Sequence, residues 1–330
     1  MSRKLLFLLA LGAIGAIVAY RASGLDFNWT LFLASLSDLK VGWLAASVIL
    51  TVLTYWIRTV RWKVLLEPLK PIRVRSLFAI TIVGFAAIYI LGRAGELARP
   101  ILLTRREGVP LTGSIATVVV ERFLDVIMLT SLFALALAVA EVPAGSEKTL
   151  GLLKSAAWFV SALAAVAMIA LVVIRTNSAR IVGLIPFKRV ASWVDSFAQG
   201  LSFLQNRRSF ALVIFHSAVL WLAIALQFWT LLLGMNFAFP LGAATLVMVS
   251  AAIGSIAQVP GIGGGFQVAY SICMTTLFQI PKEQAAATSL IAWVFSYAPT
   301  VAIAAVYMAV QGISMRELKS TIRKPESETT

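Results

Sequence analysis

The sequence predicts an all-α polytopic integral membrane protein, a helix bundle with about six full crossings and two opposed re-entrant hairpins, or up to eight hydrophobic segments in all. Of the 330 residues, 60% are hydrophobic and only 13% are charged, with a mean hydropathy of +0.92. Basic residues cluster between the long apolar segments. Two of those segments are interrupted by glycine, proline or ionisable residues, which are costly in a helix that faces lipid.

The composition also excludes other classes of protein. A net charge of +14 raises nucleic acid as a partner, but no finger, recognition helix or aromatic-basic motif accompanies it, so we expect no nucleic-acid binding. The single cysteine, Cys273, permits no intrachain disulfide and no zinc motif. We expect no metal or other cofactor.

The first two apolar segments predict two crossings. Residues 5–20 follow two basic residues and could be a cleaved signal peptide, but Tyr20 and Arg21 suit an interfacial anchor better than a cleavage site. The next crossing covers about 41–57. Six cations follow it and predict a cytoplasmic segment that includes an interfacial helix, with Trp62 and Leu65-Leu66 in the headgroups. These cations are Arg58, Arg61, Lys63, Lys70, Arg73 and Arg75.

Residues 76–104 predict the first hairpin, which enters from the cytoplasm and returns there with Gly92 and Gly95 at its turn. A full crossing would place Arg105 and Arg106 outside, against the charge bias. The remaining predicted elements are a tilted crossing at 111–140, an external loop at 141–154, a crossing at 155–174, a basic loop at 175–208 with a surface helix near Val190 to Leu204, a crossing at 210–233, a second hairpin at 241–280 that enters from outside, a crossing at 284–311, and a disordered polar tail at 316–330.

This layout makes residues 1–315 one transmembrane domain in the inner membrane, with both termini cytoplasmic. It places twenty Lys and Arg residues in cytoplasmic segments and five in external ones, while Arg93, Arg99 and Arg122 lie inside. The bias supports the orientation. It does not distinguish a re-entrant hairpin from two crossings, because the flanking loops keep their sides either way.

Six ionisable residues fall within apolar surroundings. Arg93, Glu96 and Arg99 are three apart and form one row on a helix, and Glu121 shares a face with Asp125. Arg122 completes the set, and Glu121 lies about 15 Å into its segment, near the middle of the bilayer core. Six unpaired charges there would cost about 15–20 kcal/mol, so they must pair or face a water-filled cavity. Both arrangements, a closed network and a substrate contact, remain open.

These motifs also have a family resemblance. The pattern Gly92-Arg93-x-Gly95-Glu96-x-x-Arg99-Pro100, then Glu121-Arg122-x-x-Asp125, then a Pro-Gly-Gly loop at Pro260 to Gly265, resembles the lysylphosphatidylglycerol synthase transmembrane region family of flippase-like integral membrane proteins. The resemblance covers about residues 40–312. Family members often have a glutamate shortly after the loop, where this chain has Gln267, which puts a proton-coupled role at this position in doubt.

The resemblance and the charges together define the candidate substrate-binding residues, none of which is proposed as catalytic. For the glycine-rich bend, a turn or close helix packing competes with anion binding by its N–H groups. The candidates are Arg93, Gly95, Glu96, Arg99, Pro100, Glu121, Arg122, Asp125, Pro260, Gly261, Gly263, Gly264, Gly265 and Gln267.

The leading hypothesis is a lipid translocase that holds an anionic, aminoacylated or polyisoprenoid-linked headgroup in a charged intramembrane cavity. Well-known relatives join this region to a soluble aminoacyl-transferase domain, and we expect this chain not to synthesise the lipid itself. The alternatives are a membrane scaffold for a separately encoded lipid-modifying enzyme and, third, a lipid-phosphate transferase. Expected partners are a membrane lipid, such an enzyme and a second copy of the chain.

Overall fold

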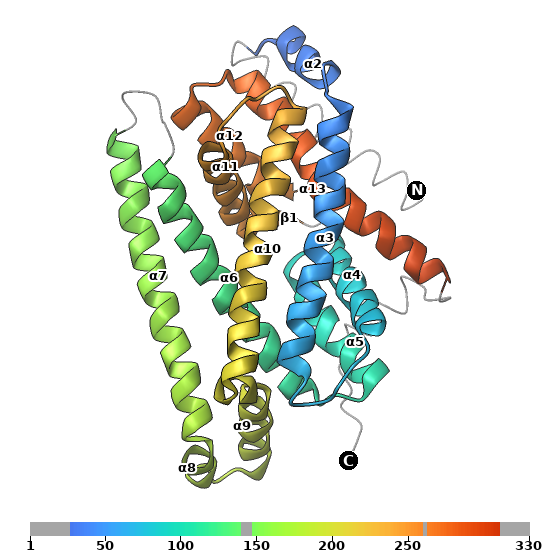
Figure 1. Cartoon of the computed structure of the whole chain (residues 1–330), viewed down its shortest axis with the longest axis vertical. Coiled ribbons are helices and arrows are strands. Elements are labelled where there is room, and N and C mark those ends of the chain that lie inside the picture. Colours follow the sequence, from blue (N-terminus) through green and yellow to red (C-terminus); the bar gives the residue numbers. More distant parts are fainter. Residues whose placement is uncertain (1–26, 140–146, 260–262, 311–330) are drawn as a thin grey trace, which may run out of the picture.

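The computed structural model describes residues 27–139, 147–259 and 263–310, and helices dominate all three ranges (Figure 1). Within them, six helices are long and apolar enough to cross a membrane, which confirms the predicted all-α membrane class; five of them correspond to predicted crossings, and the sixth, α4, belongs to the first predicted hairpin. The predicted crossing at 5–20 and the tail at 316–330 lie outside the described residues. The six helices are α3 (Val41–Leu66), α4 (Val74–Leu91), α6 (Leu111–Val139), α7 (Glu147–Thr176), α10 (Arg207–Gly234) and α13 (Lys282–Val310).

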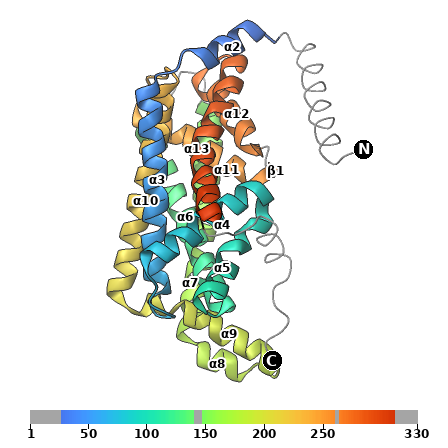
Figure 2. The same ribbon diagram turned by 90° about the vertical axis from the view of Figure 1, so that its right-hand side faces the viewer.

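Shorter elements complete the bundle. Helix α2 lies across one end of it, whereas α8 and α9 lie at the opposite end (Figure 2). Helix α9 and the turn η2 occupy the place of the predicted surface helix. The shorter elements are α2 (Trp29–Ser37), η1 (Gly92–Leu97), α5 (Ala98–Glu107), α8 (Ser178–Gly183), α9 (Lys188–Gly200), η2 (Ser202–Gln205), α11 (Leu241–Gly254), η3 (Ser255–Ala257), β1 (Gln258–Val259), β2 (Gly263–Gly264) and α12 (Gly265–Phe278).

The first predicted hairpin is present as α4, η1 and α5. Helix α4 ends at Leu91, and its C-cap residue Gly92 has a φ of +66°, which favours glycine; the chain then turns back through η1. The Ser76 hydroxyl, near the start of α4, hydrogen-bonds the Glu107 carboxylate at the end of α5. Helix α5 has 10 residues, about 15 Å, which is half of a bilayer core. Both ends of this segment therefore lie at the same end of the bundle.

The second hairpin consists of α11 and α12, each 14 residues or about 21 Å long, too short to cross the core. At its open end, the rings of Phe239 and Phe278 stack with centroids 4.7 Å apart. This open end lies beside the last turn of α10, where the Lys40 N–H donates to the Gly234 carbonyl at 2.9 Å. The first hairpin opens where α3 ends, so the two hairpins enter from opposite ends.

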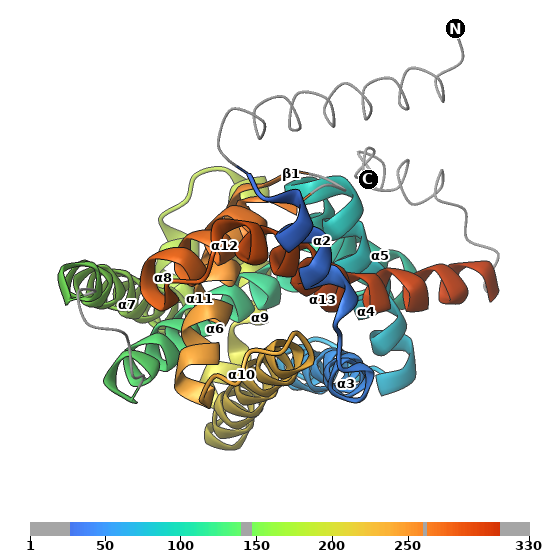
Figure 3. The ribbon, with the colours of Figure 1, turned by 90° about the horizontal axis from the view of Figure 1, so that it is seen from above.

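Each hairpin packs in its own apolar cluster. Phe266 and Tyr270 of α12 belong to a cluster with Phe228 of α10, while Phe85 of α4 belongs to a second cluster with Trp62 of α3. Seen from above, α7 lies at the edge of the bundle beside α6 (Figure 3). The candidate site lies between these two clusters.

One predicted boundary is wrong. Helix α3 does not end near Trp56 but continues to Leu66, so Arg58 and Arg61 lie within a long helix. Trp62, Leu65 and Leu66 are fully buried, not placed in the headgroup layer. The twenty cations that we predict in cytoplasmic segments are thereby reduced to eighteen.

Candidate functional site

A polar stripe along α3 forms one wall of the site. Its members recur at steps of four and three residues, so they share one helix face. The hydroxyls of Thr51 and Thr54 donate to carbonyls of the preceding turn, at 2.9 and 2.7 Å, which satisfies them inside the protein. The stripe consists of Ser47, Thr51, Thr54, Arg58 and Arg61.

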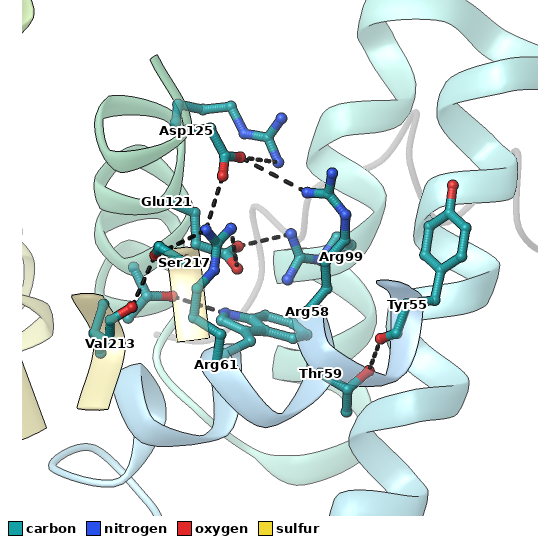
Figure 4. A network of polar contacts seen from close by, with 12 residues as sticks. Tyr55, Arg58, Thr59, Arg61, Arg99, Glu121, Asp125, Val213 and Ser217 are labelled. Carbon is teal, nitrogen blue, oxygen red and sulfur yellow. Dashed lines mark hydrogen bonds and ion pairs between the residues drawn. The ribbon is translucent and has the colours of Figure 1, made fainter. Parts of the chain in front are cut away.

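Two arginines hold Glu121 in a sealed network (Figure 4). Arg61 Nη2 lies 3.3 Å from Glu121 Oε1, and Arg99 Nη1 lies 2.7 Å from Glu121 Oε2. Arg61 Nη1 also donates to Asp125 Oδ1 at 2.8 Å and to the Ser217 hydroxyl at 3.2 Å. Arg61, Arg99 and Glu121 are at most 1% exposed, so this part of the network is closed to solvent.

Aromatic rings hold the Arg99 guanidinium where hydrogen-bond partners are few. Its carbon Cζ lies 4.1 Å from the Trp62 ring and 5.1 Å from the Phe85 ring, distances typical of cation–π contacts. The stem of Arg99 runs over Gly84, where an added Cβ would lie 2.2 Å from Arg99 Cγ. Pro100 follows within the first turn of α5, where its missing N–H breaks no helical hydrogen bond. The first hairpin is thus built to deliver one buried cation.

The outer part of the network is looser. Arg58 Nη1 and Arg122 Nη2 each lie 3.7 Å from the same atom, Asp125 Oδ2, and their side chains are 14% and 41% exposed. The other oxygen, Asp125 Oδ1, accepts from Trp221 Nε1 at 3.3 Å as well as from Arg61. Arg58 and Arg122 are therefore held by charge attraction at distances beyond a good hydrogen bond.

These outer groups line a cavity of about 500 Å³. The tips of both hairpins reach it, through Gly92 and Glu96 of η1 and Ser255 and Ile256 of η3. The rest of the cavity wall contains both polar and aromatic side chains. The hydroxyl groups of Tyr55 and Tyr89, two of these side chains, form a hydrogen bond. Further lining residues are Thr51, Thr54, Tyr55, Arg58, Phe85, Tyr89, Arg122, Asp125, Trp221, Gln227, Phe228, Phe266, Ser296 and Tyr297.

The predicted residues of the first two motifs divide between these two layers. Glu96, Arg122 and Asp125 line the cavity, whereas Arg99 and Glu121 are sealed behind it. Arg93 belongs to the turn η1, but its side chain lies outside the described part. Gly95 allows a close approach, since an added Cβ would lie 2.4 Å from the Ala87 carbonyl.

The described glycines of the third motif, the Pro-Gly-Gly loop, hold the second hairpin together. An added Cβ on Gly265 would lie 2.1 Å from the Gly254 carbonyl oxygen, so this pair requires glycine. The Gly264 N–H donates to Gln267 Oε1 at 2.7 Å, which caps α12, and Gly263 pairs with Val259. Pro260 and Gly261 lie outside the described residues. The cavity wall receives Phe266 from this segment.

Arg58 and Arg61 are the functional residues that the sequence prediction missed. The cluster of cations after Trp56 lowers the mean hydropathy of any sequence window that contains it, so this segment resembles a cytoplasmic loop. The regular steps of four and three from Ser47 to Arg61 are the signal that could have found them. Among the described residues, no group of three or more His, Cys, Asp or Glu side chains is placed to hold a metal ion.

The fold and site define a class of protein: a multi-pass helical membrane protein with a charged cavity between two opposed re-entrant hairpins. Over residues 6–304 the chain matches the sequence profile of the Lysylphosphatidylglycerol synthase TM region family. The chain belongs to this family, as its motifs predict. A search of curated proteins finds no match to the chain.

Proposed function

We propose that the protein is a lipid translocase that accepts a phospholipid headgroup in the cavity between the two hairpin tips. The observation that supports this most is the pair Arg58 and Arg122, which face the cavity at 3.7 Å from one shared carboxylate oxygen. Guanidinium groups bind phosphate through two parallel N–H donors. A phosphate can thus replace a weak ion pair with hydrogen bonds.

The sealed network explains how such a site persists at membrane depth. Moving a phosphate into the hydrocarbon core costs free energy unless cations are already present there to bind it. Cations without a counter-charge at that depth also cost free energy. Arg61 and Arg99 neutralise Glu121 permanently, while the outer arginines share Asp125 until a headgroup arrives. Each arginine and carboxylate of this network thus has an oppositely charged neighbour before a headgroup arrives. The two alternatives of the sequence analysis, a closed network and a substrate contact, describe the inner and outer layers of one site.

Opposed hairpins suit alternating access from the two membrane faces. Transporters with broken helices place their sites at the meeting point of such elements. Because no nucleotide-binding motif is present in the sequence, we infer that movement is passive or driven by an ion gradient. We propose an inner-membrane location, with the end of the bundle that contains α8 and α9 in the cytoplasm.

The family description favours a second candidate function, because it names the transmembrane region of a synthase. In that case the chain would be the membrane partner of a separately encoded lipid-modifying enzyme. Co-purification with such an enzyme, together with no lipid movement by the purified chain, would favour it. The transferase hypothesis is weaker, because arginines already engage both oxygens of Glu121 and of Asp125 and leave no free base there.

The proposal is tested in liposomes that contain the purified chain and trace phospholipid with a fluorescent acyl chain. Dithionite bleaches only the outer leaflet, so translocation raises the bleached fraction above that of protein-free liposomes. We expect rapid bleaching with the wild type and with Arg106→Gln, which removes an exposed cation at the end of α5. Arg58→Gln/Arg122→Gln should lose most of it. Equal rates in all three proteins would reject the cavity as the path.

A further inference from the structure

We infer that the cavity selects a lipid headgroup with a net negative charge, a phosphodiester with hydroxyl groups and no amine, over zwitterionic and aminoacylated lipids. This inference rests on the proposed function for its context and narrows the substrate class of the same site. It follows from the charges, the acceptors and the unpaired donors around the cavity.

The charge balance of the site is positive. The described side chains in the network and the cavity wall include four arginines, namely Arg58, Arg61, Arg99 and Arg122, and three carboxylates, namely Glu96, Glu121 and Asp125. An uncompensated positive charge inside a membrane is costly. A headgroup with one negative charge removes this surplus, whereas a cationic headgroup increases it.

The carboxylate oxygens of Glu121 and Asp125, which an amine could use as acceptors, already face other donors. An ammonium group has three donors and no acceptor, so at membrane depth it requires carboxylate oxygens. Glu121 Oε1 and Oε2 face Arg61 and Arg99, and Asp125 Oδ1 accepts from Arg61 and Trp221. Asp125 Oδ2 is shared by Arg58 and Arg122. An ammonium group that approached Glu121 or Asp125 would therefore have to displace an arginine.

Donors, by contrast, are in surplus. Arg122 Nε is buried and finds no hydrogen-bond partner among the described residues, and its Nη2 reaches Asp125 only at 3.7 Å. The buried hydroxyl of Ser296 in α13, another lining residue, also finds no partner among them. A phosphate suits Arg122 because it accepts several hydrogen bonds. A neutral hydroxyl suits Ser296 because it both donates and accepts hydrogen bonds.

Equilibrium binding tests this preference without requiring transport. Calorimetry on the purified full chain would compare three short-chain probes: dioctanoyl phosphatidylglycerol, dioctanoyl phosphatidylethanolamine and the lysyl ester of the first. We expect phosphatidylglycerol to bind at least about tenfold more tightly than either amine lipid. Tenfold in affinity is about 1.4 kcal/mol, which is the size of the contribution of one charged hydrogen bond.

Matched variants assign the preference to the cavity. Arg58→Gln/Arg122→Gln should remove it, and Arg106→Gln should retain it. If the double variant does not fold, Arg122→Gln alone serves, because Arg122 has the more exposed side chain of the two, and it should reduce the preference at least about threefold. Equal affinity for the three lipids, preference for an amine lipid, no binding at all, or an unchanged preference in the variants would each overturn the inference.

The inference and the proposed function fail separately. Selective binding without movement in liposomes would reject the translocase and retain the anion-selective site. Equal movement and equal binding of all three lipids would retain the translocase and reject the selectivity.

Discussion

Glu121 lies at the centre of the buried network because each of its carboxylate oxygens faces a different arginine. Arg61 comes from α3 and Arg99 from the first hairpin, so one side chain joins three segments far apart in the sequence. The neighbouring Asp125 repeats the arrangement with one side turned to the cavity. At the residue scale, the site therefore separates cations that stabilise the fold from cations that are available to a ligand.

This separation predicts unequal costs of removing Arg61 and Arg58. Arg61→Gln leaves Glu121 and Asp125 without a shared buried partner and should cost about 3–5 kcal/mol of unfolding free energy. Arg58→Gln removes one long ion pair and a cation–π contact with Phe85, but Asp125 keeps Arg61 and Arg122, so this change should cost less, about 1–2 kcal/mol. Thermal unfolding of both variants in detergent measures the difference. Similar melting temperatures for the two would contradict the two-layer network.

Gly84 provides a second test at this scale. In Gly84→Ala the new Cβ would lie 2.2 Å from Arg99 Cγ, so the hairpin must shift at a typical cost of about 1–3 kcal/mol. Gly42→Ala is the matched control, because a Cβ there meets nothing within 4 Å. We expect a lower melting temperature for the first variant and an unchanged or higher one for the second. The reverse order would refute the placement of Arg99 over Gly84.

At the scale of elements, the sequence predicted both hairpins for a physical reason that the structure confirms. Glycines and ionisable residues that interrupt an apolar segment are costly in a lipid-facing helix, and a turn of the backbone at membrane depth, as at Gly92, must be buried in protein or line a cavity. The wrong prediction, the end of the second crossing, has a physical reason too. Arg58 and Arg61 satisfy their charges through partners about 60 residues away in α6, and no local window of sequence contains these partners.

Crosslinking tests the first hairpin directly. In a Cys273→Ala background, Ser76→Cys and Glu107→Cys should be joined by a short thiol-reactive crosslinker, because these side chains are in contact. If α5 instead completed a crossing, they would be separated by a bilayer core of about 30 Å. The control pair Lys40→Cys and Glu107→Cys lies at opposite ends of the bundle and should not crosslink. A linked control pair would contradict the fold.

At the scale of the whole molecule, charge distinguishes the two ends of the bundle. The described helices and loops at the end that contains α8 and α9 include twelve basic residues, against four at the end that contains α2. The twelve are Lys63, Lys70, Arg73, Arg75, Arg105, Arg106, Arg175, Arg180, Lys188, Arg189, Arg207 and Arg208, and the four are Lys40, Lys148, Lys154 and Lys282. Such an excess marks the cytoplasmic face of membrane proteins.

This asymmetry predicts the sidedness of labelling. In the Cys273→Ala background, Arg106→Cys should react with a membrane-impermeant maleimide only in inside-out vesicles, because it lies at the basic end. Lys40→Cys should react only in right-side-out vesicles or intact cells. Reaction of both from the same side would contradict the opposed hairpins, and exchanged sides would reverse the orientation.

A lipid headgroup that enters the cavity between the hairpin tips must touch the residues that line it. The most direct measurement uses a phospholipid with a photoactivatable headgroup, irradiated with the purified chain in liposomes and mapped by mass spectrometry of peptides. We expect labelling near Thr54 and Arg58 of α3 and near Arg122 of α6. Excess unlabelled phosphatidylglycerol should suppress this labelling. Labelling confined to the lipid-facing side of α7, such as exposed Trp158, and unaffected by the competitor would contradict this expectation.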